Sequence, residues 1–194
     1  MAKINQDSLM SLEAYAKARP EFRKQAIAHK ARRKIFVGDH VMLQFEDEIT
    51  VRYQIQEMLR IEKTFEEEGI QDELDAYTPL LPDGSNWKAT QAIEYSDVEE
   101  RKLKLVELKG LERHTYIQVG TQDRVYAIAD EDLPRENDEK TSAIHFLRFE
   151  LDAGMVAAAK AGEPIAVGVD LPAYNIHVLE IAPETQTSLV DDLK

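Results

Sequence analysis

The sequence VRYQIQEMLR at residues 51–60, followed by PDGSNWK at residues 82–88, is the stretch on which the organisation of the chain depends. Apolar residues recur there at steps of three and four, which predicts an amphipathic helix with one buried face. The members of this apolar stripe are Val51, Ile55, Met58, Leu59 and Phe65. Glu62 falls on the same stripe, where a carboxylate needs either a partner or a proton. Polar side chains also crowd the flanks of the helix, so we expect a functional site here.

Two arginines of this helix suggest an anion-binding pocket. Arg52 and Arg60 are eight residues apart, about two helical turns, so their guanidinium groups are expected on similar sides of the helix. Two such planar donors can clamp a carboxylate or a phosphate. Glu57 is spaced to anchor Arg60, and Trp87, the only tryptophan, follows a tight turn and can form a wall. The predicted ligand-binding residues are Arg52, Glu57, Arg60, Trp87 and His145.

Two other interpretations of these residues stay open. The ionic side chains can form a buried network that holds the helix to the sheet, with Trp87 as an ordinary core residue. Tryptophan and arginine also dominate the hot spots of protein interfaces, so a partner-binding face is the second alternative.

The end of the central helix is predicted at Gly69, because glycine suits the C-terminal cap of a helix. This end places three consecutive glutamates, residues 66–68, in the last turn, where the helix dipole disfavours negative charge. Basic side chains from elsewhere would then neutralise them, or the helix would end earlier, or the glutamates would form a solvated acidic face. A further helix is expected at residues 70–77.

The segments on either side predict the fold class. Upstream, Ser11 is expected to cap a helix, Pro20 to begin another, and residues 35–45 to form a hairpin. Downstream, strands are predicted at residues 88–95, 115–119, 124–129, 142–151, 165–169 and 176–181, with helices at 96–109, opened by a capping box of Ser96 and Glu99, and at 152–161. Both faces of residues 142–151 are partly apolar, so this strand is expected to be central. We predict an α+β fold with a mainly antiparallel sheet, an N-terminal helical region and a central amphipathic helix.

Length and composition indicate one domain. The chain has 194 residues, of which 43% are hydrophobic, and this is enough for a substantial core. We predict a single domain over residues 1–194, made of a basic helical segment at residues 1–34 and an α+β body at residues 35–194. No apolar run approaches the roughly 18 residues of a membrane span, and residues 1–10 lack a secretory apolar segment. We therefore expect a cytoplasmic protein that does not bind membranes.

The net charge of −13 is unevenly distributed. Residues 1–34 carry a net charge of +6, and the remainder carries −19. A basic segment raises nucleic acid as a partner, but an acidic body would repel phosphate backbones over most of the surface. We favour a basic segment docked on an acidic body, its own or that of a neighbouring copy, and predict no nucleic-acid partner.

Catalytic chemistry is not apparent in the sequence. The chain has no cysteine, which excludes thiol nucleophiles, disulfides and iron–sulfur clusters held by its own thiolates. It lacks phosphate-binding glycine loops and a Gly-x-Ser-x-Gly turn, and its five histidines lack metal-site spacings. We expect no cofactor and no metal, although His145 with Glu57 or Glu62 would be a possible metal site assembled from distant residues. The catalytic residues, if there are any, stay unknown.

Several segments resemble one bacterial family over nearly the whole chain. They are RYQIQEMLR at residues 52–60, ELDAY at 73–77, PDGSNWKAT at 82–90, RVYAIADED at 124–132 and EKTSAIHFLRFEL at 139–151. The family is known only as a domain of unknown function. The resemblance implies genes often encoded beside a rubrerythrin and a cysteine-rich iron–sulfur protein, and hence a role in redox or peroxide stress. It implies no catalytic residues.

Three functional hypotheses follow. The first is a non-enzymatic accessory or docking protein in a bacterial redox-stress pathway, with rubrerythrin-type and iron–sulfur proteins as partners. The second is a small-molecule-binding enzyme or sensor with an anion pocket around Arg52, Arg60 and Trp87. The third is a structural homo-oligomer driven by the charge asymmetry.

Overall fold

The computed structural model describes residues 4–194, and its contacts divide the chain into two compact units. The helical unit comprises the chain up to Arg32 together with Glu46–Leu81, and the sheet unit comprises Arg33–Phe45 and Pro82–Lys194. Contacts therefore group the central helix with the N-terminal segment, whereas the sequence analysis placed it in the body at residues 35–194. The α+β class is confirmed, and every strand pairing is antiparallel. The assignment of residues 1–194 to one domain stays a prediction.

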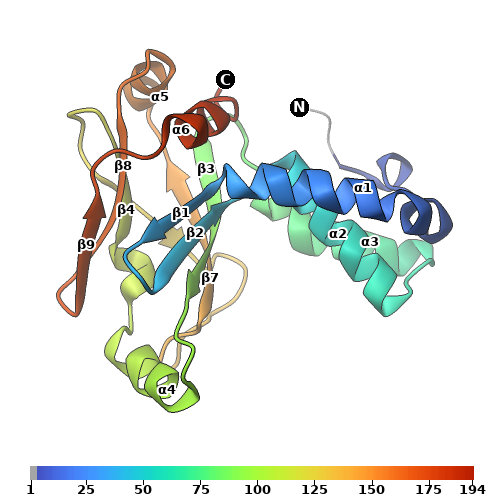
Figure 1. Ribbon diagram of the computed structural model, residues 1–194, viewed down its shortest axis with the longest axis horizontal. Helices are drawn as coiled ribbons and strands as arrows, with labels where there is room; N and C mark the ends of the chain where they lie inside the picture. The colour runs from blue at the N-terminus through green and yellow to red at the C-terminus, as the bar shows by residue number, and fades with distance from the viewer. Residues whose placement is uncertain (1–3) are drawn as a thin grey trace. The chain divides into compact units, whose positions relative to one another are not determined.

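Three α-helices form the helical unit, and in Figure 1 they run beside one another. They are α1 (Leu12–Ala31), α2 (Glu48–Glu62) and α3 (Glu67–Tyr77), with the short 3-10 helices η1 (Gln6–Ser8) and η2 (Thr78–Leu80). Ser11 caps α1 as predicted, but Pro20 lies inside α1 and does not begin a new helix. Tyr15 and Ala26 lie three turns apart on one face of α1, and both are buried. Proline has no backbone N–H, so α1 lacks one hydrogen bond at Pro20, and the packing of this face offsets that loss.

The central helix ends at Glu62, seven residues before the predicted end at Gly69. Lys63 terminates it in the left-handed conformation, and α3 then begins at Glu67. Glu67 and Glu68 thus occupy the first turn of α3, where the helix dipole favours negative charge. Gly69 lies within α3, where an added Cβ would be 2.6 Å from Thr64 Cγ2. Its small size therefore permits a close approach to the preceding linker and does not cap a helix.

Two antiparallel sheets form the sheet unit, where the sequence predicted one. The first has the order β1 (Lys34–Val37), β2 (Val41–Phe45), β3 (Asn86–Ile93), β7 (Ile144–Glu150), β6 (Ile128–Ala129). The second has the order β5 (Val125–Tyr126), β4 (Thr115–Val119), β8 (Ile165–Leu171), β9 (Tyr174–Val178). The predicted hairpin at residues 35–45 is β1–β2, and the predicted central strand is β7, which lies between β3 and β6. The chain passes from one sheet to the other between β3 and β4, between β5 and β6, and between β7 and β8.

Helices close the ends of the sheet unit. They are α4 (Val98–Glu107), the 3-10 helix η3 (Leu111–His114), α5 (Ala153–Lys160) and α6 (Pro183–Val190). In Figure 1, α4 lies at the end of the sheet unit opposite to α5 and α6. Asp97, and not the predicted Ser96, caps α4, since its side chain accepts a hydrogen bond from the Glu100 backbone N–H. No helix within residues 4–194 has both the length and the apolar character that crossing a bilayer requires.

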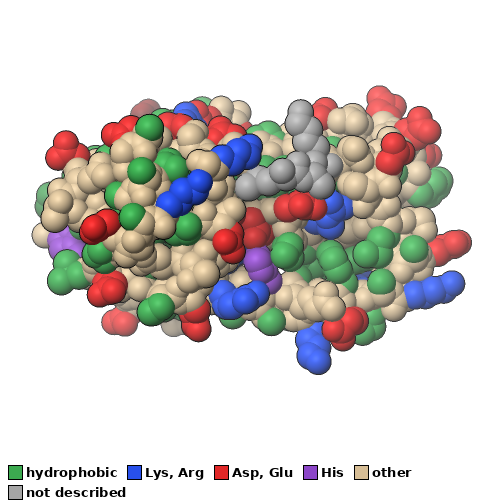
Figure 2. All heavy atoms as spheres, turned by 90° about the horizontal axis from the view of Figure 1, so that it is seen from above, with side chains coloured by type: hydrophobic (Ala, Val, Ile, Leu, Met, Phe, Trp, Pro, Cys, Tyr) green, Lys and Arg blue, Asp and Glu red, His purple; other side chains and the backbone are tan. Residues whose placement is uncertain are grey.

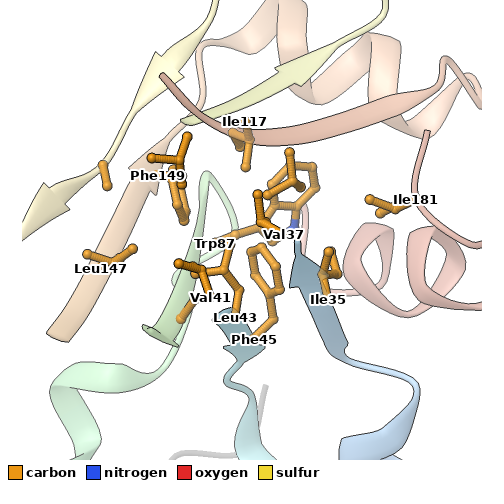
Figure 3. Packing of buried hydrophobic residues seen from close by; sticks show 14 of the residues in the cluster. Ile35, Val37, Val41, Leu43, Phe45, Trp87, Ile117, Leu147, Phe149 and Ile181 are labelled. Carbon is orange, nitrogen blue, oxygen red and sulfur yellow. The ribbon is translucent and has the colours of Figure 1, made fainter. Parts of the chain in front are cut away.

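The main core lies between the two sheets. Alternate residues of β7, among them Leu147 and Phe149, are buried as their period-two pattern predicts. Trp87 on β3 pairs with Phe149 and is fully buried. Figure 3 shows its indole surrounded by side chains from both sheets. A separate, smaller apolar cluster forms the core of the helical unit around Val51, Ile55 and Leu59.

Candidate functional site

Glu57 is the centre of an ionic cluster that joins α2 to α1. Its carboxylate accepts hydrogen bonds from the Tyr15 hydroxyl at 2.6 Å and from Arg19 Nε and Nη2 at 2.7 and 2.9 Å. Arg60 Nη2 lies 3.5 Å away. The hydrogen bonds from Arg19, and then that from Tyr15, lower the pKa of Glu57 to about 2. Burial and the neighbouring Glu57 carboxylate raise the pKa of Tyr15. This cluster ties two helices together, and no strand takes part in these contacts.

Arg52 is held in a different direction. Its Nη1 donates to the Ser8 carbonyl at 2.6 Å, and its Nη2 pairs with Glu48 at 2.6 Å. Gln56, one turn along, is buried and bonds both the N–H and the carbonyl of Met10. The polar side chains of α2 therefore bind the residues that precede α1, at Ser8 and Met10, as well as α1 itself. Arg52 and Arg60 each contact a carboxylate on their own helix, and Arg60 Nε has no hydrogen-bond partner among the described residues.

The other two predicted site residues belong to the sheet unit. Trp87 is a core residue whose indole N–H donates to the Leu189 carbonyl at 2.7 Å. The His145 ring is fully buried, with Nδ1 2.6 Å from Asp130 Oδ2 and Nε2 2.8 Å from Thr141 Oγ1. Three of the five predicted residues thus lie in the helical unit and two in the sheet unit. Their combination into one anion pocket stays a prediction.

The order carboxylate–imidazole–hydroxyl around His145 resembles that of a nucleophilic triad. Thr141, however, is only 1% exposed, so its hydroxyl cannot meet a substrate in this conformation. Glu112 Oε2 also lies 3.8 Å from His145 Nε2. We interpret this cluster as a buried polar network that holds the segment between Asp130 and Thr141 against β7. Within residues 4–194, no group of three His, Asp or Glu side chains is arranged to hold a metal ion.

Replacing Glu57 with glutamine should destabilise the helical unit by about 1–3 kcal/mol at neutral pH, because the charged hydrogen bonds to Arg19 are lost. The pKa of Glu57 is depressed, so its contribution is full above the ordinary glutamate pKa and is lost as the pH falls toward 2. The stability difference between wild type and Glu57→Gln should therefore shrink on acidification. Urea unfolding at several pH values measures it. Glu62→Gln, an exposed carboxylate on the same helix, is the control, and equal stabilities at neutral pH would contradict the assignment.

A hollow of about 470 Å³ opens on the helical unit, and the sequence analysis did not identify it. It lies between the residues at the start of α1, from Gln6 to Glu13, and the junction of α2 with α3. We call it the apolar groove, and its apolar lining residues are Leu9, Met10, Leu12, Leu59, Phe65 and Ile70. Because Gln56 and Arg52 anchor the backbone at Met10 and Ser8, one wall of the groove is held in place.

Phe65 differs most from its predicted environment. The helical stripe predicted it to be buried, yet its side chain is 74% exposed beyond the end of α2, and Ile61 is 60% exposed. The turn at Lys63 breaks the period of the stripe, so that the buried face of α2 ends at Leu59 and Glu62 is exposed. A large exposed aromatic residue beside a concave apolar surface is typical of an interaction site. Its signal in the sequence is a phenylalanine followed directly by three glutamates.

One acidic side chain lines the apolar groove, and others lie close to it in the sequence. Glu13 lines it, and Glu62 and the glutamates at residues 66–68 are exposed next to Phe65 in the sequence, with Lys63 as one basic residue among them. Figure 2 shows one face of the protein, on which hydrophobic side chains lie exposed among acidic ones. An apolar floor with a negative rim selects for a partner that is apolar and basic.

A family model described as "Protein of unknown function (DUF3501)" matches residues 3–193. The chain belongs to the DUF3501 family. This DUF3501 protein is similar to a novel protein of unknown function from Burkholderia pseudomallei, known from a crystal structure. The two are 53% identical over 100% of each chain, with a TM-score of 0.95. No curated protein matches the chain. The predicted membership of a family of unknown function is confirmed, and the association with rubrerythrin stays an expectation.

Proposed function

We propose that this DUF3501 protein is a non-enzymatic accessory protein that docks onto partners in a bacterial redox or peroxide-stress pathway. The proposed partners are a rubrerythrin-type protein and a cysteine-rich iron–sulfur protein. The observation that carries the docking function is the acid-rimmed apolar groove. The pathway rests on the family resemblance and on the lack of cysteine: thiolate ligands for an iron–sulfur cluster must come from the partner.

The groove suits a protein partner for two physical reasons. Phe65 and Ile61 already expose apolar area that a partner can remove from water, at roughly 25 cal/mol per Å². The hydrogen bonds of Gln56 and Arg52 hold the groove wall at Ser8 and Met10 in place. The protein therefore loses little conformational entropy when a partner binds in the groove. The ligand that fits is a helical segment of the partner with apolar side chains on one face and lysine or arginine beside them.

Replacing Phe65 with glutamate should weaken partner binding at least tenfold, because it removes an aromatic anchor and places a carboxylate that must lose its water in an apolar contact. Isothermal titration calorimetry with the rubrerythrin-type protein and the iron–sulfur protein of the same bacterium is the measurement. Since Phe65 is largely exposed, the free energy of unfolding should change by no more than about 0.5 kcal/mol. Affinity should also fall with added salt, as expected for a charged rim.

Leu179→Glu is the matched control, since Leu179 is 82% exposed but belongs to the sheet unit and is not one of the residues that line the groove. It should leave binding unchanged. Failure of both partners to bind at tens of micromolar would contradict the pathway. Binding that tolerates Phe65→Glu as well as it tolerates Leu179→Glu would instead contradict docking through the groove.

A further inference from the structure

An aromatic row crosses one face of the second sheet, in the sheet unit and outside the apolar groove. Tyr126 on β5 pairs with Tyr116 on β4, Tyr116 pairs with Gly168 on β8, and Gly168 pairs with His177 on β9. The side chains of paired residues stand on the same face of an antiparallel sheet. Four strands therefore bring two phenols and one imidazole into a single line.

Gly168 makes room for a direct hydrogen bond across β8. The Tyr116 hydroxyl lies 2.7 Å from His177 Nδ1. A Cβ at position 168 would be 2.6 Å from the Tyr116 hydroxyl oxygen and 2.8 Å from His177 Nδ1. Any larger residue would push the two groups apart. The phenol therefore reaches over a strand to an imidazole only because that strand has no side chain there.

Tyr116 cannot touch a substrate, because it is 2% exposed. The Arg124 guanidinium covers its ring at 4.1 Å, and the Tyr126 ring lies 5.9 Å from it. Burial raises the pKa of Tyr116, so its phenol is protonated at neutral pH. Group transfer needs contact with the reacting atom, whereas an electron can leave a shielded ring over several ångströms. Electron loss is thus the reaction that this burial still permits.

We propose that Tyr116 is a one-electron donor whose phenolic proton passes to His177 when the electron leaves. The O–H bond of Tyr116 breaks, an N–H bond forms at His177 Nδ1, and the electron reduces a one-electron oxidant such as an oxidised metal complex. The products are a neutral tyrosyl radical and a protonated imidazole. Because His177 is exposed, water solvates the new positive charge.

The surroundings favour Tyr116 over Tyr126 as the final radical site. Tyr126 is 43% exposed and within reach of an oxidant, but its hydroxyl donates to Asp170 at 2.6 Å. The hydrogen bond from Tyr126 itself, with those from His114 and Arg124, makes that carboxylate a weak proton acceptor: the pKa of Asp170 is lowered. An imidazole is the stronger base. The oxidant therefore removes an electron from Tyr126 at the surface, Tyr116 then reduces Tyr126, and the radical remains on Tyr116. Arg124 opposes oxidation by its charge, so Arg124→Gln should speed it.

The test is photochemical oxidation of the intact protein by flash-generated tris(bipyridine)ruthenium(III), followed by electron paramagnetic resonance and transient absorption. Wild type should give a neutral tyrosyl radical whose formation slows in deuterated water. Tyr116→Phe should remove most of that signal, whereas Tyr126→Phe should retain it with slower formation. His177→Leu, at an exposed position, should slow formation at least tenfold.

Two results would overturn the proposal. One is a radical yield in Tyr116→Phe equal to that of wild type, since the oxidised residue would then be another of the seven tyrosines or Trp87. The other is a formation rate unaffected by His177→Leu, since the proton would then go elsewhere. Neither result bears on partner binding through the apolar groove.

Discussion

Asp192→Asn should lower the free energy of unfolding of the sheet unit by about 3–5 kcal/mol, the range for breaking a buried ion pair. Arg33 is 1% exposed, and its Nη2 donates to Asp192 Oδ2, while Nη1 and Nε donate to the carbonyls of Ser188 and Phe45. Asparagine keeps the shape of the side chain but removes its charge. A buried guanidinium then loses a nearby counter-charge, and desolvation of the cation is compensated less well.

Equilibrium unfolding in urea, followed by the fluorescence of Trp87, measures this loss. Asp191→Asn is the control, because Asp191 is the exposed neighbour and should change stability by less than about 0.5 kcal/mol. The double variant Arg33→Met, Asp192→Leu should be more stable than Asp192→Asn alone, since it removes the buried guanidinium together with its carboxylate. A loss below about 1 kcal/mol for Asp192→Asn would show that other groups near Arg33 suffice.

Trp87→Ala should cost about 3–5 kcal/mol of stability, as expected for deleting a fully buried aromatic side chain. The substitution leaves a cavity between the two sheets and removes the hydrogen bond to the Leu189 carbonyl. Trp87→Phe keeps most of the packing and loses that hydrogen bond, so it should cost less, about 1–3 kcal/mol. Urea unfolding followed by far-ultraviolet circular dichroism measures both variants, since their tryptophan is gone.

This pair of variants also tests whether Trp87 lines a ligand pocket, as the sequence analysis proposed. A pocket wall is partly open to solvent, so its truncation would change stability little and ligand affinity much. A large loss of stability for Trp87→Ala would identify Trp87 as a core residue. A change below about 1 kcal/mol would contradict the core assignment.

Patterns of short range identified several elements of the fold. The period-two alternation of residues 142–151 located β7 and its buried face, because successive side chains of a strand point to opposite sides. Ser11 located the start of α1, since its side chain caps the backbone N–H three residues on. These features depend on neighbours in the chain, so the sequence contains the necessary information.

The candidate site could not be predicted from short-range sequence patterns. Glu57, Arg60 and Arg52 were identified as an ionic group on α2, but the principal partners of Glu57 lie 38 and 42 residues away on α1. The exposure of Phe65 depends on a single left-handed residue, Lys63, which interrupts a pattern that otherwise continues. No local rule predicts either feature, and the second of them gives the apolar groove its exposed aromatic side chain.

By itself, the sequence determined the α+β class, the hairpin at residues 35–45, the cap of α1 at Ser11 and the lack of thiol chemistry, because these follow from local periodicity and composition. Only the tertiary structure decided how ionic and aromatic side chains are partnered. It placed Glu57 between two helices, made Trp87 part of the core and set Tyr116 against His177 over Gly168. The reason is that burial and pairing depend on contacts between residues distant in the chain, and spacing along the chain does not encode those contacts.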